Sequence, residues 1–354
     1  MTSITGTTDL ARVDRDPLAP VRAWLWTIAG LIFAMVVVGG ATRLTESGLS
    51  ITEWKPIAGA LPPLGEAAWL AEFEKYKQIP QFAKLFPDMT LSGFKFIFYW
   101  EWSHRLLGRL IGVAFALPMI WFWISGRLPG KLKPRLVGLL ALGGLQGAVG
   151  WWMVASGLVG RVEVAPERLA THLTLASVTL IATIWLAIGL RPKPLETAAA
   201  PLKGGAGALL VLVLCQIGLG ALVAGSRAGM TYNTWPLMDG RLVPPAEDLG
   251  RLEPLWRNVF ENITLVQFDH RMLAYAVIAF ALWHAIVARR RAPGTAAARR
   301  ATALAGLALT QVLIGILTLL LVVPLWAGLL HQAFAMIVLS MATIHRARFS
   351  VSSA

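Results

Sequence analysis

The amino-acid sequence predicts an all-α integral membrane protein whose eight transmembrane helices form two pseudo-symmetric four-helix bundles. Three observations support this fold class. Of the 354 residues, 56% are hydrophobic and only 14% are charged, whereas soluble domains are roughly 25% charged. Eight apolar runs are long enough to cross a bilayer, for which a helix needs about 20 residues. The two halves of the chain also repeat the same order of motifs.

The eight apolar runs alternate with linkers of two kinds. The linkers after the second, fourth and sixth runs are short and basic, whereas those after the first and fifth, 43–94 and 226–261, are long and balanced in charge. The positive-inside rule then places both termini in the cytoplasm and both long loops outside. The net charge of +13 follows from the same rule, so we expect no nucleic-acid partner. The runs lie near residues 22–42, 95–124, 135–155, 169–190, 205–225, 262–288, 299–322 and 326–346.

The N-terminal segment contains three aspartates and no apolar core. It therefore resembles neither a signal peptide nor a transit peptide, and a bacterial cytoplasmic (inner) membrane is the simplest location. We expect five units in order along the chain: a cytoplasmic tail (1–21), a first four-helix unit (22–192), a cytoplasmic linker (193–203), a second four-helix unit (204–346) and a cytoplasmic tail (347–354).

The repeat of the two halves is visible in their motifs. GGATRLTESGLSITEWKPIAGALPP from Gly39 corresponds to AGSRAGMTYNTWPLMDGRLVPP from Ala224. Each half then has a helix with a His-Arg pair, a helix with Gln-x-x-x-Gly (Gln146 and Gln311) and a last helix that begins near a second histidine. Two four-helix units with the same orientation, related by duplication, explain this order.

Four histidines lie at matching places in the two halves: His104, His172, His270 and His331. In the predicted topology all four lie early in helices that start outside, so each half can offer two imidazoles to one centre. Zinc would require further Cys, His or carboxylate ligands in each half. Haem brings its own four equatorial nitrogens and suits two axial imidazoles inside a four-helix bundle. The sequence therefore predicts haem sites.

Charged residues near these histidines have two interpretations each. Arg105 and Arg271, or Arg43 and Arg227, could pair with haem propionates, or they could be snorkelling interfacial residues. Glu101 precedes His104 by one helical turn.

The place that matches Glu101 in the second half is Gln267. A carboxylate beside a reacting haem can take up protons or stabilise developing positive charge; alternatively, Glu101 is an interfacial partner of an arginine. The asymmetry favours one reactive half and one electron-carrying half. Because the repeat has an amide at this place, we also expect the fold to tolerate Glu101→Gln.

Two further histidines and the single cysteine have other predicted roles. His284 and His345 each follow a predicted ligand by 14 residues, about 21 Å along one helix face. Two stacked haems would have this spacing, but both histidines lie near basic helix ends, which favours interfacial residues. Cys215 alone cannot form an internal disulfide or a thiolate cluster, and we expect it to be a small core residue.

Several motifs together resemble the haem A synthase family of cytochrome oxidase biogenesis. They are EWSHRLLGR at 101–109, GGATRLTESGLSITEW at 39–54 and the four histidines on alternate helices. The resemblance extends from about Val21 to Arg346. Neither long loop contains cysteine, so the chain looks closest to the bacterial and mitochondrial type without loop cysteines.

The resemblance implies an oxidoreductase that converts the C8 methyl of haem O to the formyl of haem A, for haem-copper oxidases. It implies that Glu101 is catalytic, that His104 and His172 bind the substrate haem, and that His270 and His331 bind a haem b cofactor. Expected partners are haem O, haem O synthase, an electron donor or acceptor and membrane lipid, with homo-oligomerisation left open. Two alternatives remain: a dihaem cytochrome b subunit acting with quinone, and a haem transporter or chaperone without chemistry.

Overall fold

Eight membrane-length helices dominate the structure, a computed structural model that describes residues 16–190 and 197–349. Parts of the predicted tails and linker lie outside the described residues. The eight helices agree with the eight predicted runs to within a few residues at each end, and the part of the chain that the structure describes contains no β-strand. The bounds are α1 (Ala19–Leu44), α4 (Leu91–Ile124), α5 (Lys133–Ala155), α6 (Pro166–Gly189), α7 (Lys203–Gly225), α10 (Ile263–Arg291), α11 (Ala296–Leu320) and α12 (Leu325–Ala347).

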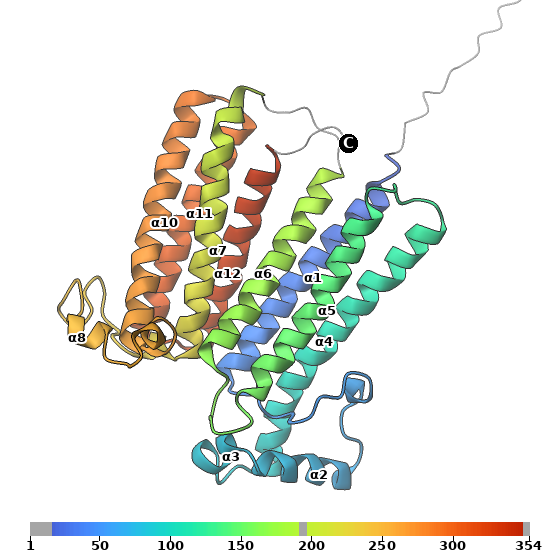
Figure 1. Ribbon diagram of the computed structural model, residues 1–354, viewed down its shortest axis with the longest axis vertical. Coiled ribbons are helices and arrows are strands. Elements are labelled where there is room, and N and C mark those ends of the chain that lie inside the picture. Colours follow the sequence, from blue (N-terminus) through green and yellow to red (C-terminus); the bar gives the residue numbers. More distant parts are fainter. Residues whose placement is uncertain (1–15, 191–196, 350–354) are drawn as a thin grey trace, which may run out of the picture.

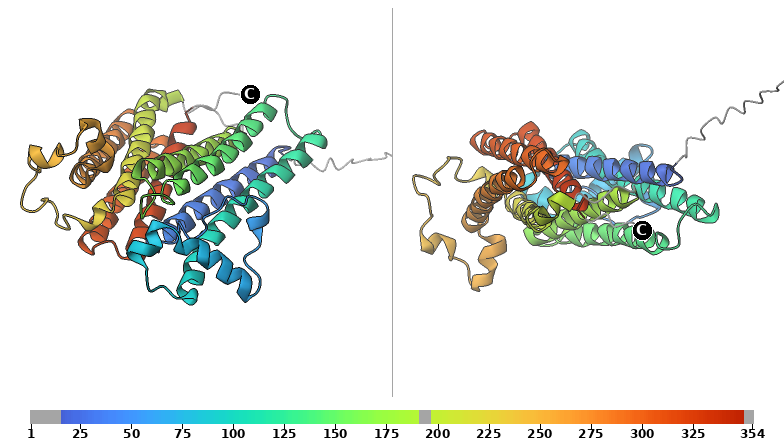
Figure 2. Two further views of the ribbon diagram at one scale, coloured as in Figure 1. Left: turned by 60° about the horizontal axis from the view of Figure 1, so that its bottom comes forward. Right: turned by 90° about the horizontal axis from the view of Figure 1, so that it is seen from above.

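These helices form two groups of four (Figures 1 and 2). The first bundle contains α1, α4, α5 and α6, and the second contains α7, α10, α11 and α12. Helices α1, α6, α7 and α12 form the contact between the bundles. One continuous apolar cluster runs through both, with Leu25, Leu180, Leu209 and Leu339 among its fully buried side chains. Such interdigitated packing gives the bundles a fixed relative position.

The two long loops lie at the same end of the molecule, opposite the end where α1 begins and α12 finishes (Figure 1). This arrangement agrees with the predicted placement of both loops on one side. The sequence analysis did not predict that the loops contain helices of their own. They are η1 (Ala58–Ala60), α2 (Glu66–Lys77) and α3 (Pro80–Leu85) in the first loop, and η3 (Ala228–Met230), α8 (Ala246–Leu249), η4 (Leu255–Arg257) and α9 (Asn258–Glu261) in the second. A further short helix, η2 (Thr197–Leu202), precedes α7.

Helix α4 supports the first loop because it is longer than a membrane crossing requires. Its 34 residues span about 50 Å, against a hydrocarbon thickness of about 30 Å. The N-terminal turns of α4 therefore extend beyond the bundle, where Phe94 and Phe98 pack against Trp69, Phe73 and Tyr76 of α2. This aromatic cluster holds the first loop against the N-terminal end of α4, the helix that contains Glu101 and His104.

Cys215 differs from its predicted place. It is exposed on the surface of α7, outside the buried stripe that includes Leu209, Val213 and Ile217. The prediction of a core residue is therefore wrong. A run that is apolar all round gives no periodic signal, so hydropathy could not tell which face of α7 is buried.

Candidate functional site

Each of the four predicted ligand histidines packs against a glycine of a neighbouring helix. A Cβ atom added to any of these glycines would lie about 3 Å from an imidazole atom, so a larger residue would displace the ring. The glycines thus admit the imidazoles into the bundle interiors. The pairs, with the distance from the added Cβ to the nearest ring atom, are His104 with Gly39 (2.9 Å), His172 with Gly150 (2.9 Å), His270 with Gly220 (3.1 Å) and His331 with Gly315 (2.8 Å).

Three of the four histidines also contact a glutamine one helical turn before that glycine. The side-chain amide nitrogen of each lies 3.0–3.2 Å from Nδ1 of its histidine and donates to the backbone carbonyl of the same residue. These glutamines are Gln146 for His172, Gln216 for His270 and Gln311 for His331. The sequence analysis missed Gln216, although its spacing to Gly220 is the same Gln-x-x-x-Gly pattern. Met35 has the matching place before Gly39, so His104 lacks a glutamine there.

The imidazoles of the second bundle have the spacing that a haem iron requires. The ring centroids of His270 and His331 lie 6.5 Å apart. Two imidazoles on opposite sides of a metal have centroids about 6 Å apart, because each metal–nitrogen bond is about 2 Å. The paired nitrogen donors, their spacing and the glycine cradles therefore fit a bis-histidine haem.

His284 and His345 form a different kind of pair. Their Nε2 atoms lie 2.9 Å apart in a direct hydrogen bond, and their exposed fractions are only 1% and 0%. Both histidines lie towards the C-terminal ends of α10 and α12, but they are buried against each other, which the sequence did not predict. The ring of His284 lies against Gly205, and the ring of Phe349 covers His345. A metal ion has no room between two nitrogens at hydrogen-bonding distance, so this pair does not have the geometry of a second haem site.

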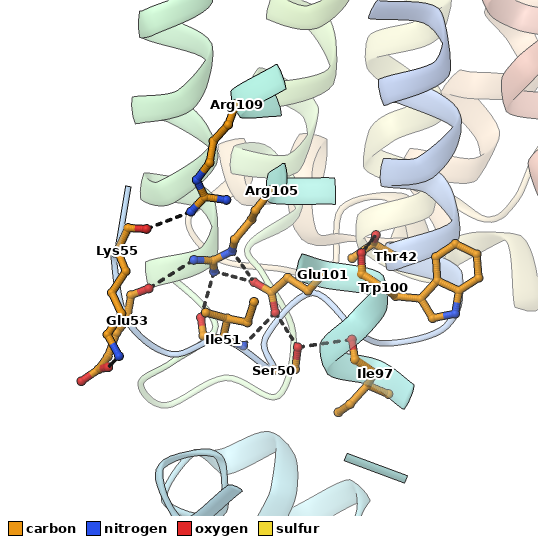
Figure 3. Close-up of polar contacts among 10 residues, drawn as sticks. All are labelled: Thr42, Ser50, Ile51, Glu53, Lys55, Ile97, Trp100, Glu101, Arg105 and Arg109. Carbon is orange, nitrogen blue, oxygen red and sulfur yellow. Dashed lines mark hydrogen bonds and ion pairs between the residues drawn. The ribbon is translucent and has the colours of Figure 1, made fainter. Parts of the chain in front are cut away.

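Glu101 lies at the centre of a clamp between α4 and the first outer loop (Figure 3). It is 2% exposed. One carboxylate oxygen accepts hydrogen bonds from Ser50 Oγ and from the backbone N–H of Ile51, both at 2.8 Å. The other oxygen forms an ion pair with Arg105. Arg105 also donates to the backbone carbonyls of Ile51 (2.8 Å) and Glu53 (3.2 Å). Glu101 is thus a buried partner of an arginine, one turn from His104.

The first loop is fixed on its other side by α2. Arg109 of α4 donates to the carbonyl of Lys55 (Figure 3) and to the carbonyl of Pro56. The side chains of Glu53 and Lys55 join an ion-pair network with Lys75 of α2. Hydrogen bonds from Lys55, and then from Lys75, hold the pKa of the Glu53 carboxyl below its usual value. The carboxyl therefore stays ionised, and the loop stays pinned between α2 and α4.

The second bundle has a matching clamp, but the hydrogen bonds between the loop and the residue that corresponds to Glu101 run in the opposite direction. Arg271 donates to the carbonyls of Tyr232 (2.7 Å) and Thr234 (3.0 Å), as Arg105 does in the first bundle. Gln267, however, donates its amide hydrogens to the carbonyls of Ala228 and Thr231, whereas Glu101 only accepts. The loop groups around Glu101 are donors, so Gln267 is no direct precedent for an amide at 101, and tolerance of Glu101→Gln stays a prediction.

Arg43 and Arg227 join the two bundles at their outer ends. Arg43 donates to Glu163 (2.7 Å) and to the carbonyl of Ala224 (3.0 Å), and Arg227 pairs with Glu46 (2.7 Å) and Glu163. Counted from the glycines that face His104 and His270, Gly39 and Gly220, position 43 is equivalent to 224 and position 46 to 227. Equivalent ends of α1 and α7 thus meet each other, as at an isologous interface.

All four arginines considered as propionate partners consequently have partners within the protein. Arg105 and Arg271 bind loop carbonyls, and Arg43 and Arg227 bind glutamates. Among the described residues, the Nε atoms of Arg43 and Arg271 are nevertheless buried without a hydrogen-bond partner. These two N–H groups remain available to an anionic ligand.

Comparison with known proteins identifies the family of this chain. The family model described as cytochrome oxidase assembly protein, COX15-CtaA, matches residues 22–343. The chain belongs to this family. It is 63% identical over 328 residues to the haem A synthase of Beijerinckia indica, in an alignment that covers 92% of this chain and 91% of that protein. It is 55% identical over 347 residues to the haem A synthase of Mesorhizobium japonicum, in an alignment that covers 98% of this chain and 95% of that protein.

Proposed function

We propose that this protein is a haem A synthase, which oxidises the C8 methyl group of haem O to the formyl group of haem A. The observation that carries the proposal is the paired imidazoles, each seated against a glycine inside a bundle, in a chain whose relatives have that name. Converting a methyl to a formyl group adds one oxygen atom and removes four electrons. A second, redox-active site in the same protein suits such a reaction.

The second bundle is the proposed site of a haem b cofactor, which His270 and His331 would hold. When bound, haem b supplies one-electron redox chemistry. Gln216 and Gln311 hold these two histidines in place, because each side-chain amide donates to the backbone carbonyl of its histidine and lies within 3.2 Å of the ring Nδ1. The buried N–H of Arg271 is available to a propionate.

The first bundle, with His104 and His172, is the proposed site of haem O. A substrate must enter and leave, whereas a cofactor can stay. Helices α4 and α5 pack together less extensively than their counterparts α10 and α11. The buried share of their most apolar stretches is also lower, 17% and 11% against 33% and 22%. The more open bundle therefore suits the exchanging ligand.

Glu101 is the proposed catalytic residue. Its buried carboxylate lies one turn from His104 and can hold a proton or stabilise positive charge near the reacting group. Arg105 and two loop donors fix its position. The first loop thus becomes part of the catalytic site.

The closed pair of His284 and His345 disfavours a cytochrome b with two stacked haems, since these imidazoles bond to each other. Haem O synthase, an electron acceptor and membrane lipid are the partners that the reaction implies.

Haem analysis of the purified protein tests the proposed function. A pyridine haemochrome assay distinguishes b-, o- and a-type haems. Haem A or a partly oxidised intermediate, together with haem b, is the expected result. Two b haems without conversion of added haem O would identify an electron-transfer cytochrome, and no bound haem would contradict both.

The proposed orientation has both termini in the cytoplasm of a bacterium and both long loops outside. Reporter fusions near Leu128 or Arg290 should read as cytoplasmic, and fusions near Lys75 or Glu247 as external. A cytoplasmic signal from either long loop would overturn this orientation and move all four ligand histidines to the other leaflet.

A further inference from the structure

A chain of direct contacts joins the histidines of the two bundles. His331 and Gln332 are consecutive residues on α12, but they face different bundles. The His331 ring lies against Gly315 inside the second bundle. The side-chain amide of Gln332 reaches into the first bundle, where it donates a hydrogen bond to the carbonyl of Val36 on α1 (2.8 Å).

Two consecutive glycines of α1 complete the connection. A Cβ at Gly40 would lie 2.1 Å from the amide oxygen of Gln332, and a Cβ at Gly39 would lie 2.9 Å from Nε2 of His104. Gly40 thus accommodates Gln332 from the second bundle, and Gly39 accommodates the ligand histidine of the first. Contacts run without interruption from His331 through Gln332, Gly40 and Gly39 to His104.

The corresponding interface of the repeat, between α6 and α7, lacks this amide. Leu173 follows His172 as Gln332 follows His331, and Ala221 follows Gly220 as Gly40 follows Gly39. The contact between α6 and α7 therefore has an apolar residue and an alanine at the equivalent places. An amide at an otherwise apolar interface must be hydrogen-bonded to be tolerated. Packing alone thus gives no reason for Gln332 on one side only.

We propose that Gln332 is a positioning residue that couples the two haem sites. It fixes α12, which contains His331, against the segment of α1 on which the His104 ring lies. The state of the haem in one bundle then changes the energy of the haem in the other, and such coupling is reciprocal. This inference rests on the proposed function, because it requires haem in both bundles.

The test measures the midpoint potential of the b-type haem in the purified holoprotein, with and without added haem O. In the wild-type protein, haem O is expected to shift this potential. Gln332→Met keeps the length of the side chain and removes both polar atoms. It should leave the amount of bound haem b unchanged and reduce the haem O-induced shift to less than half.

Gly40→Ala provides an independent variant, because its Cβ must displace the Gln332 amide. It should reduce the shift to a similar extent, and Gly40→Ala combined with Gln332→Met should reduce it no further, since both changes break one contact. The matched control is Leu173→Ala, which removes packing beside His172 and should retain the wild-type shift.

A shift of wild-type size in Gln332→Met, or equal losses in Gln332→Met and Leu173→Ala, would overturn the inference, as would no shift in the wild-type protein. Failure of the proposed function has a different signature. A wild-type protein that binds haem O without converting it would contradict the reaction but still show the shift.

Discussion

The first and second bundles hold their outer loops with the same arginine geometry and with opposite polarity at one neighbouring residue. Arg105 and Arg271 each donate to loop carbonyls two residues apart. Beside them, Glu101 accepts hydrogen bonds from its loop, whereas Gln267 donates to its own. The comparison teaches that the two bundles hold their loops with the same arginine arrangement, while the hydrogen-bonding group beside the histidine differs together with the loop around it.

The bundles also differ in how firmly they hold their imidazoles. In the second bundle both ligand histidines contact a glutamine, whereas in the first bundle Met35 replaces the glutamine at His104. The first bundle is also the more open one between α4 and α5. These differences agree with a permanent ligand in the second bundle and an exchanging one in the first.

The largest expected effect tests the assignment of the second bundle. His270→Ala or His331→Ala should abolish the b-type haem, because each removes one of the two proposed ligands. The absorption spectrum and haem content of the purified variants measure this loss. His284→Ala is the matched control: it removes a buried hydrogen-bonded histidine from α10, the helix of His270, and should keep haem b. Low-spin b haem at wild-type stoichiometry in both ligand variants would show that the assignment is wrong.

The next effect concerns Glu101. Glu101→Gln should stop most haem A formation and let haem O or a partly oxidised intermediate accumulate, while haem b stays bound. The amide loses the charge beside Arg105 and turns an N–H group toward loop donors or the arginine. Glu101→Asp, which keeps the charge, should retain more activity. Haem extraction followed by chromatography measures the products.

Ser50→Ala separates the chemistry of Glu101 from its support of the loop. It removes one hydrogen bond of the clamp to a charged group, about 1.5–3 kcal/mol, and keeps the carboxylate, so most activity should remain. If Ser50→Ala lost as much activity as Glu101→Gln, Glu101 would act by holding the loop. Haem A formation near the wild-type rate in Glu101→Gln would leave the carboxylate as an ion-pair partner only.

A smaller effect is expected when the second bundle is made to resemble the first at the glutamine. Gln216→Met copies Met35 and removes the group that orients His270. The affinity for haem b should fall about 10- to 100-fold, the usual result of losing such a contact. Haem retention during dilution in detergent measures it, with Met35→Gln as a control that should leave haem b unaffected. Unchanged retention in Gln216→Met would mean that the glycine cradle alone positions His270.

The smallest effect concerns the polarity of the second clamp. Gln267→Glu places a carboxylate against the carbonyls of Ala228 and Thr231, which then lose their hydrogen-bond donor. The proximity of Arg271 compensates in part, so we expect a loss of about 1–3 kcal/mol in stability. Thermal unfolding and limited proteolysis of the second loop measure it. A variant as stable as the wild type would show that polarity does not separate the two clamps.

Much of the candidate site could be predicted from the sequence. A helix in a bilayer must satisfy its own backbone hydrogen bonds over about 20 apolar residues, so hydropathy located all eight spans. The internal repeat aligned His104 with His270 and His172 with His331, which identified the glycine-seated histidines before any contact was known. The contrast between Glu101 and Gln267 was also visible in the sequence alone.

Only the tertiary structure decided which groups these residues meet. The partners of Glu101 come from a loop about 50 residues earlier in the chain, and Gln332 meets a segment about 300 residues away. The hydrogen bond between His284 and His345, the helices of the outer loops and the exposure of Cys215 were likewise missed. Hydropathy and spacing report the period of a single helix, whereas these features depend on how helices and loops from distant parts of the chain pack together.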